Sequence, residues 1–314
     1  KAHYRDDVFK ERAILGERLR LAIGLSLYPV DRPSPISKGV KESAIAEKVY
    51  EPPLINVIPF ACDACEPKAL EVTSNCRGCL AHPCTSVCPV KAIAIKDGRS
   101  VIDKEKCIKC GRCKDTCPYG AIIQYDRPCA AACGVGAIES DELGRAKINY
   151  DKCVSCGMCL VSCPFGAIAD KTQIFQLIQS IKKGDEVIAA VAPAFVGQFG
   201  PLATPDKFKE ALSELGFSDV VEVALGADLG AIEEAHHYVN KVVNGDDPFI
   251  GTSCCPSWSV MAKTHFPELA SYISGELTPM VATARIIKKE RPNSRIVFNN
   301  ESCCNHWREF TRDI

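Results

Sequence analysis

The stretch CIKCGRCKDTCP, residues 107–118, decides how the first half of this chain folds, and CVSCGMCLVSCP, residues 153–164, repeats its spacing. Each run holds three cysteines separated by two residues and a fourth after three more, followed by proline. In such a run the first three thiolates wrap one cubane, and the fourth reaches a neighbouring cluster. A structural zinc site needs only four thiolates, usually with a long gap between two pairs. Two complete runs therefore predict 4Fe–4S clusters, which carry electrons.

The distribution of cysteine separates this chain from disulfide-stabilised proteins. Sixteen of the 20 cysteines lie within residues 62–163, and the others form the adjacent pairs Cys254/Cys255 and Cys303/Cys304. Disulfide-rich scaffolds are usually short secreted chains. This chain has 314 residues, no signal-peptide pattern and regular Cys-x-x-Cys spacing. We therefore expect thiolate ligands in a reducing compartment and a cytoplasmic protein.

Length and charge restrict the possibilities further. A chain of 314 residues predicts two domains with a short additional segment. The formal net charge of -1 favours neither nucleic acid nor an anionic membrane as a partner. Since no apolar run reaches about eighteen residues, we expect no membrane insertion.

A degenerate repeat runs through the cysteine-rich region. Four segments end alike, with two cysteines four positions apart and an Ala-Ile pair that follows the second; they are residues 84–93, 113–122, 129–138 and 159–168. Each predicts a cysteine turn, a short helix and the start of an apolar strand. Two such halves make one bacterial-ferredoxin fold, so the four halves predict two ferredoxin-like units in tandem over residues 59–170.

The exchange of the fourth ligand predicts how the sixteen cysteines divide. The expected sets are Cys76, Cys79, Cys84 and Cys117; Cys88, Cys107, Cys110 and Cys113; Cys133, Cys153, Cys156 and Cys159; and Cys62, Cys65, Cys129 and Cys163. The alternative is that Cys62 and Cys65 are free thiols or a small separate site, which leaves three clusters. We expect His82 to pack or to donate a hydrogen bond, and Tyr119 and Phe165 to exclude water.

The regions on either side of the cysteine repeat have other patterns. Residues 1–58 predict a helical arm that packs on the later domains, with a Pro-rich break at 31–36. After Asp170 the chain alternates helices and strands, which is typical of a parallel sheet with covering helices. The expected helices are 174–181, 207–215, one that begins after an N-cap at Asp228 and runs to 243, and 280–289; the expected strands are 187–191, 220–223, 248–252 and 295–298.

The stretch GTSCCPSW, residues 251–258, contains two adjacent cysteines, which cannot readily bond to each other. Taken alone, it fits two small buried thiols at a strand end. Beside the ferredoxin motifs it resembles the first signature of iron-only (FeFe) hydrogenases, in the clostridial-type branch with additional N-terminal clusters. Residues 191–194, 278–283 and the cysteines of 62–84 also resemble that branch.

The resemblance implies a partial α/β hydrogenase-like domain over 171–314 that follows the α+β cluster domain. In that family a cubane is bridged to a two-iron subsite with CO and cyanide ligands, which interconverts protons, electrons and dihydrogen. By position, Cys255 is expected to bind the active-site cubane, and Cys254 to be the thiol that relays protons. Trp258 is expected to pack. The implied partner is a soluble ferredoxin or a flavin-containing redox subunit.

The end of the chain departs from the family pattern. After 295–298 the family has Gly-Pro-Cys and a lysine, whereas residues 299–309 read NNESCCNHWRE, and the last signature is absent. The spacing of Cys303 and Cys304 does not support their use as substitutes. We expect a truncated, frame-shifted or split product that does not assemble the active site alone. The hypotheses are the N-terminal part of a hydrogenase, a non-catalytic electron-transfer or sensory protein, and an iron–sulphur assembly factor.

Overall fold

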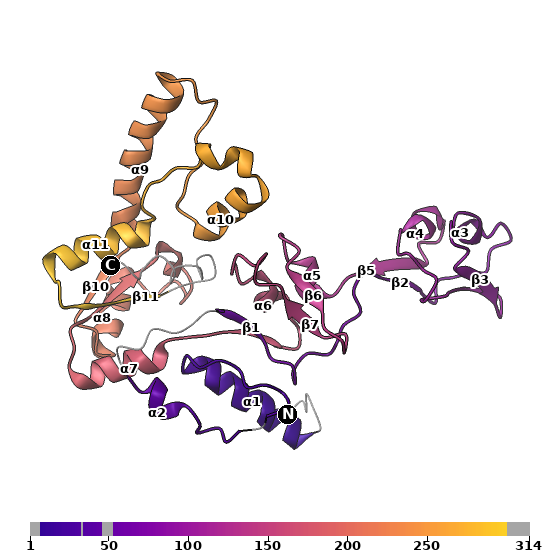
Figure 1. Cartoon of the computed structure of the whole chain (residues 1–314), viewed down its shortest axis with the longest axis horizontal. Coiled ribbons are helices and arrows are strands. Elements are labelled where there is room, and N and C mark those ends of the chain that lie inside the picture. Colours follow the sequence, from indigo (N-terminus) through magenta and orange to yellow (C-terminus); the bar gives the residue numbers. More distant parts are fainter. Residues whose placement is uncertain (1–6, 33, 46–52, 300–314) are drawn as a thin grey trace.

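The computed structural model describes residues 7–32, 34–45 and 53–299, so Cys303 and Cys304 lie outside the described residues. The elements form three groups along the chain (Figure 1). Two N-terminal helices come first, a region of short hairpins and one-turn helices that carries sixteen cysteines follows, and a parallel sheet with helices comes last.

We call residues 68–125 the outer unit, because Figure 1 shows it projecting from the rest of the molecule. Its first strand pairs antiparallel with its last, and its second with its third. Leu70, Ile93 and Ile122 pack with Cys84 and Cys113 in its small core. Its elements are β2 (Ala69–Val72), α3 (Pro83–Ser86), β3 (Ile93–Lys96), β4 (Arg99–Ile102), α4 (Arg112–Thr116) and β5 (Ile122–Tyr125).

Residues 53–66 and 126–171 form the inner unit, which has the same pairing order. β1 pairs antiparallel with β8, and β6 pairs antiparallel with β7. Ile55, Ile148 and Ile168 form its core with Cys129 and Cys159. Its elements are β1 (Ile55–Val57), α5 (Pro128–Ala131), β6 (Ile138–Ser140), β7 (Ala146–Ile148), α6 (Met158–Ser162) and β8 (Ile168–Asp170).

The two units are nested along the chain. β1 precedes the outer unit in sequence and β6 follows it, so the outer unit is an insertion within the inner one. The sequence predicts two consecutive units that begin at residue 59. It misses the strand Ile55–Val57 because that strand has three residues and no cysteine, and only its pairing with β8 assigns it to the inner unit.

The N-terminal helices α1 (Val8–Ala22) and α2 (Val40–Ser43) are joined by an irregular segment. The carboxylate of Asp7 caps α1 by accepting the backbone N–H groups of Phe9 and Lys10. Ile14 and Leu21 of α1 pack against Ile58, Ala61 and Ala167 of the inner unit. Within the described residues, the helix α1 therefore packs against the inner unit and not against the outer unit.

The third part is built on a parallel sheet of β10 (Asp219–Glu222), β9 (Val187–Val191) and β11 (Arg295–Asn299), in that order. All five residues of β9 are buried, as expected for the central strand of a parallel sheet. The helices and helical turns are α7 (Ile174–Lys183), η1 (Pro193–Phe195), α8 (Pro205–Glu214), α9 (Ala224–Tyr238), the π-helical turn η2 (Val239–Val243), α10 (Pro256–His265), η3 (Pro267–Tyr272) and α11 (Pro279–Glu290).

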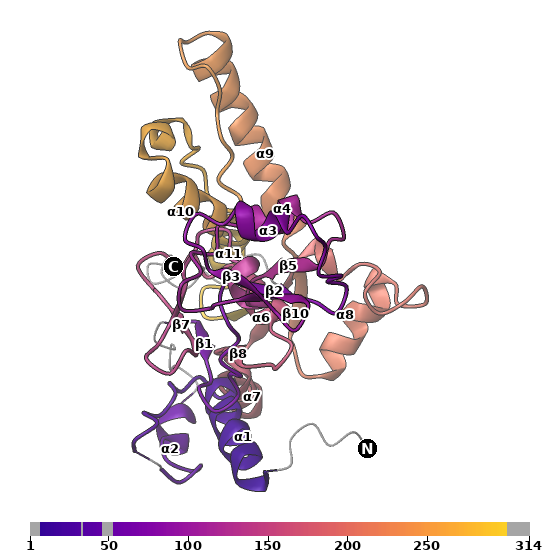
Figure 2. The same ribbon diagram turned by 90° about the vertical axis from the view of Figure 1, so that its right-hand side faces the viewer.

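Close packing of α9 on α11 depends on Gly226, since an added Cβ would overlap the Pro279 carbonyl and the Thr283 hydroxyl. Figures 1 and 2 show α9 extending away from the sheet, on the side opposite to α1. None of the helices in the described ranges is long and apolar enough to cross a membrane.

Two predicted features of this part are wrong. The long helix begins at Ala224 after Val223, so Asp228 lies inside α9 and does not cap it. The segment 248–252 is not a strand of the sheet, and Gly251 makes only an isolated bridge with Ile273. The backbone of Gly251 instead bonds the end of η3 and the segment after it, since its N–H donates to the Tyr272 carbonyl at 2.8 Å and its carbonyl accepts the Ser274 N–H at 2.7 Å.

Candidate functional site

The fold gathers the sixteen cysteines into four groups, three of which surround an open hollow. Groups 1 and 2 belong to the outer unit, and groups 3 and 4 to the inner unit. Group 1, Cys76, Cys79, Cys84 and Cys117, lines a hollow of about 340 Å³. Group 2, Cys88, Cys107, Cys110 and Cys113, lines one of about 290 Å³. Group 3, Cys62, Cys65, Cys129 and Cys163, lines one of about 340 Å³. Cys62 and Cys65 thus lie beside the two cysteines that sequence reasoning assigned to them.

Group 4 consists of Cys133, Cys153, Cys156 and Cys159. Burial, together with the charges of Cys153, Cys156 and Cys133, raises the pKa of Cys159 to about 12. Burial also raises the pKa of Cys153, again with contributions from Cys133 and Cys156. The four sulphurs therefore lie close enough to interact electrostatically, in an apolar setting where a thiolate needs a compensating cation such as iron.

The first Cys-x-x-Cys turn of each group, at 62–65, 76–79, 107–110 and 153–156, has the same backbone shape. The residue before the second cysteine has a positive φ in all four: 50° at Ala64, 55° at Gly78, 58° at Lys109 and 52° at Ser155. This left-handed conformation is uncommon for residues other than glycine. Its recurrence at Ala64 gives Cys62 and Cys65 the same turn as the cysteines of the complete runs.

A second recurring turn explains the Ala-Ile ending of each repeat. The third residue after the last cysteine has a positive φ at Lys91, Gly120, Gly136 and Gly166. The next residue, always alanine, then donates its backbone N–H to the cysteine sulphur. The N···S distances are 3.2 Å for Ala92 and Cys88, 3.4 Å for Ala121 and Cys117, 3.2 Å for Ala137 and Cys133, and 3.4 Å for Ala167 and Cys163. Such bonds stabilise a thiolate and tune the potential of the cluster it holds.

The cysteine groups fit a 4Fe–4S cluster better than a single metal ion. Their hollows are lined by four thiols and apolar residues such as Ala121 and Ile122 in group 1, and Ala167 and Ile168 in group 3. Within residues 7–32, 34–45 and 53–299, no three Cys, His, Asp or Glu side chains are close enough to share one ion. A cubane accepts wider spacing, because each thiolate binds a different iron.

The hydrogenase-like signature lies against the inner unit. Cys254 is exposed, and Cys255 is half-buried at the N-cap of α10. Ser257 Oγ, two residues further on, donates a hydrogen bond of 3.0 Å to the carbonyl of Val154. Val154 directly follows Cys153 of group 4, so this contact brings the Cys254/Cys255 pair to the innermost cluster site.

The loop that carries Cys254 is held by polar contacts within its own domain. The Ser253 backbone N–H donates to Glu234 at 3.3 Å, and the Ser253 hydroxyl donates to the Glu276 carbonyl at 2.9 Å. The Glu276 carboxylate lies 2.9 Å from His237 Nδ1. Its pKa is raised, mainly by a hydrogen bond with Glu233.

The described part of this domain does not supply the ligands of a complete hydrogenase active site. Cys254 and Cys255 are its only cysteines among the described residues after 171, whereas a cubane needs four ligands. His82, at the N-cap of α3, does not line the group 1 hollow. Tyr119 lines group 1 and Phe165 lines group 3.

Sequence reasoning missed two residues that approach the thiols. Ser100 Oγ lies 3.2 Å from Cys84 Sγ, and Arg127 lines the group 3 hollow while only 3% exposed. Ser100 comes from the β3–β4 hairpin, outside any cysteine motif. The position of Arg127, directly before the Pro-Cys that starts α5, was the only available signal.

Comparison with known families agrees with both halves of this geometry. Residues 100–123 and 146–169 each match the 4Fe-4S binding domain, and residues 185–312 match the iron only hydrogenase large subunit, C-terminal domain.

The individual relatives are of the same two kinds, hydrogenases and ferredoxins. Iron hydrogenase 1 of Clostridium pasteurianum is 31% identical over 57% of this chain and 32% of its own length. The periplasmic [Fe] hydrogenase large subunit of Nitratidesulfovibrio vulgaris is 32% identical over 60% of this chain and 44% of its own. An uncharacterized ferredoxin of Methanocaldococcus jannaschii is 50% identical over 52 residues, which are 17% of this chain and 34% of the ferredoxin.

The chain thus spans less than half the length of the two hydrogenases that it matches. Its cysteine groups, family matches and relatives lead to the same conclusion. The chain is an iron–sulphur electron-transfer protein that binds 4Fe–4S clusters and is related to the large subunits of iron-only hydrogenases.

Proposed function

We propose that the chain is a wire of four 4Fe–4S clusters, held by groups 1 to 4 in two nested ferredoxin-like units, that carries electrons to a hydrogenase-like domain. The observation that carries the proposal is the contact between Ser257 Oγ and the Val154 carbonyl, which sets group 4 beside the Cys254/Cys255 pair. The other end of the wire is the outer unit, which projects into solvent (Figure 1).

Contacts at the joint between the units support the order of the clusters. Lys109, in the Cys-x-x-Cys turn of group 2, donates through Nζ to the carbonyl of Pro67 at 2.8 Å. Pro67 is two residues from Cys65 of group 3. Lys104 Nζ forms an ion pair with the carboxylate of Glu66, the residue before Pro67, at 2.8 Å. Group 2 therefore faces the inner unit, and group 1, whose Cys84 lies on α3, is farther out (Figure 1).

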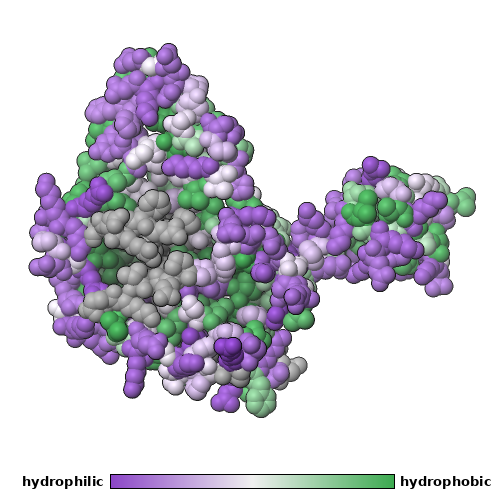
Figure 3. Space-filling model, in the orientation of Figure 1, coloured by the Kyte–Doolittle hydropathy of each residue, from purple (hydrophilic) through white to green (hydrophobic). Residues whose placement is uncertain are grey.

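The surface around group 1 suits an acidic redox partner. Leu80, next to Cys79, is 98% exposed, and Tyr119 beside the same hollow is 53% exposed. Residues 68–125 contain ten Lys and Arg against five Asp and Glu, a formal balance of +5 in a chain whose total is -1. Figure 3 shows the hydrophilic surface of this unit broken by an apolar patch. A small acidic ferredoxin matches both features, since opposite charge steers the encounter.

Iron counting tests the wire. Anaerobically reconstituted chain is expected to bind about sixteen irons, four for each cubane. The substitution Cys129→Ser, in group 3, is expected to reduce this to about twelve, while Cys254→Ser, in the hydrogenase-like domain, leaves the count unchanged. A wild-type count of twelve contradicts the fourth cluster and favours Cys62 and Cys65 as free thiols.

Reduction kinetics test the docking face. We expect Arg77→Glu and Leu80→Asp to slow reduction by an acidic ferredoxin at low salt by about tenfold or more, because electrostatic steering falls with lost charge. Lys182→Glu, on α7 of the other domain, is the matched control. Reduction by dithionite should be the same in all variants, and equal rates with ferredoxin would contradict docking at this face.

For the end of the wire, the resemblance implies a two-iron subsite that interconverts protons and electrons with dihydrogen when bound. We propose Cys255 as a ligand of its cubane and Cys254 as the exposed thiol that exchanges protons there. The second candidate function is electron transfer or sensing without hydrogen chemistry, and it is favoured by the two-cysteine ligand supply of the described domain. Infrared bands of metal-bound CO and cyanide after maturation support the first candidate, and their absence supports the second.

A further inference from the structure

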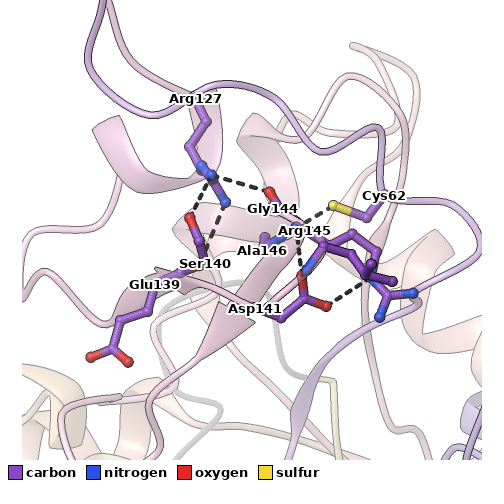
Figure 4. Close-up of polar contacts among 9 residues, drawn as sticks. Cys62, Arg127, Glu139, Ser140, Asp141, Gly144, Arg145 and Ala146 are labelled. Carbon is purple, nitrogen blue, oxygen red and sulfur yellow. Dashed lines mark hydrogen bonds and ion pairs between the residues drawn. The ribbon is translucent and has the colours of Figure 1, made fainter. Parts of the chain in front are cut away.

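A buried arginine lies beside one of the four cysteine groups. Arg127 is 3% exposed and lines the hollow of group 3 together with its four cysteines. It directly precedes α5, which carries Cys129. Figure 4 shows its guanidinium held over the β6–β7 hairpin, near Cys62.

The acceptors that hold the guanidinium are all neutral. Nη2 donates to Ser140 Oγ at 2.8 Å and to the Gly144 carbonyl at 3.3 Å, and Nη1 donates to the Glu139 carbonyl at 3.5 Å (Figure 4). The buried Nε–H has no hydrogen-bond partner among the described residues. The side chain is therefore fixed in place, and its Nε–H is left without an acceptor among those residues.

The exposed Asp63 also lines this hollow, and the other nearby carboxylates are committed elsewhere. Asp126 accepts the backbone N–H groups of Arg127 and Lys68, and the Glu139 carboxylate bonds Asn149 and Lys152. Asp141 bonds Arg145 at 2.7 Å. No ion pair with Arg127 occurs within the part of the chain that the structure describes. An arginine stays protonated in proteins, and a buried charge without an anion is costly.

The basic residues around the other two hollows differ in their surroundings. Arg77 at group 1 and Arg112 at group 2 are exposed, so water screens their charge. Lys109 at group 2 is committed to the Pro67 carbonyl. Among the three hollows, group 3 alone has a buried cation with an unused donor in its lining.

We propose that Arg127 raises the reduction potential of the cluster held by group 3, through its buried positive charge and its free Nε–H. The inference rests on the proposed function, because it requires a cluster at group 3. Reduction adds one electron from an external donor to the oxidised cluster and breaks no bond. The added negative charge is stabilised by the fixed cation in a medium of low dielectric constant. The cluster of group 3 is thereby reduced more readily, and it can store an electron on its way from the outer unit to group 4.

Potentiometric titration followed by electron paramagnetic resonance tests the proposal on the full, cluster-loaded chain. Arg127→Gln removes the charge and is expected to lower the reduction equilibrium constant of the group 3 cluster at least tenfold, about 59 mV for one electron. Arg127→Lys keeps the charge and is expected to keep most of the potential. Arg145→Gln is the matched control. It also removes a positive charge from the β6–β7 hairpin, but the guanidinium of Arg145 is already paired with Asp141.

The signal is assigned with Cys129→Ser, which should lose the group 3 wave and about four irons. If that variant titrates like wild type with full iron, the proposed cluster fails and the inference with it. If Arg127→Gln keeps its iron and its potential, the cluster at group 3 stands but the role of Arg127 is overturned. The role is also overturned if Arg145→Gln shifts the potential as much as Arg127→Gln does.

Two further outcomes concern cluster loss. Loss of iron in Arg127→Gln but not in Arg127→Lys supports the proposal when the Lys variant keeps a near wild-type potential, because the charge is then what the cluster requires. Loss of iron in both variants overturns it, since Arg127 would then only build the hairpin.

Discussion

The outer and inner units share one ligand geometry but have different surroundings. Both pair the first strand with the last and the second with the third, and both place an alanine N–H on a cysteine sulphur. The outer unit projects into solvent with exposed basic residues (Figure 1). The inner unit is covered by α1, contacts α10 through Ser257 and contains the buried Arg127. Local sequence thus sets how a cluster is held, and tertiary contacts set which role it can take.

The largest effect that separates the units is expected at Gly78. In the outer unit, a Cβ at this position would overlap the carbonyl of Gly98, whereas the equivalent Cys62–Cys65 turn of the inner unit accommodates Ala64 at a similar φ. Gly78→Ala should therefore displace the Cys76–Cys79 turn, cost about 1–3 kcal/mol and lose about four irons from group 1. Iron analysis and thermal unfolding measure both effects.

Ala64→Ser is the matched control in the inner unit, because the Cys62–Cys65 turn already holds a Cβ at the same backbone conformation. We expect full iron content in this variant. If Gly78→Ala also retains all its iron, the two turns are equivalent and the proposed difference between them is wrong.

An intermediate effect is expected at the contact between the inner unit and the hydrogenase-like domain. Ser257→Ala leaves the Val154 carbonyl without its donor at a buried position, at a cost of about 1–3 kcal/mol. Hydrogen exchange of amides in α10 should accelerate about tenfold, since about 1.4 kcal/mol corresponds to that factor. Amides of the outer unit should be unaffected.

Ser213→Ala serves as its control, since that hydroxyl bonds the Lys209 carbonyl on the exposed face of α8. Unchanged exchange in α10 of the Ser257 variant would show that the two parts are not held together by this contact.

The smallest effect is expected from Glu17, on the helix α1, which packs against the inner unit and, among the described residues, not against the outer unit. Burial raises the pKa of Glu17, and the Tyr28 N–H and Arg20 oppose the rise only in part. The folded state then binds the proton more tightly than the unfolded state, so stability falls as pH rises from about 4.5 through the raised pKa. Glu17→Gln should remove this dependence and be more stable than wild type above that window.

Thermal unfolding between pH 5 and pH 8 checks this sign, with Glu42→Gln at an exposed position of α2 as the control. A stability difference that shrinks as pH rises would contradict the prediction.

Several elements followed directly from the chain. The helices Ile174–Lys183 and Pro279–Glu290 and the strands Val187–Val191 and Arg295–Asn299 lie where periodicity placed them, because one face or the whole element is apolar. The strand at 248–252 and the cap at Asp228 failed, because Gly251 bonds Tyr272 and Ser274 outside the sheet and α9 starts a turn before Asp228. Pattern alone does not reveal which neighbours a segment will have.

The sequence by itself determined that this chain holds iron–sulphur clusters, since Cys-x-x-Cys spacing is a local property and each turn is built by consecutive residues. Only the tertiary structure decided that the units are nested, that the Cys62–Cys65 turn lies beside Cys129 and Cys163, and that Arg127 is buried at that hollow. The physical reason is range: a turn depends on the φ of one residue, whereas strand pairing, burial and an unpaired charge depend on residues far apart in the chain.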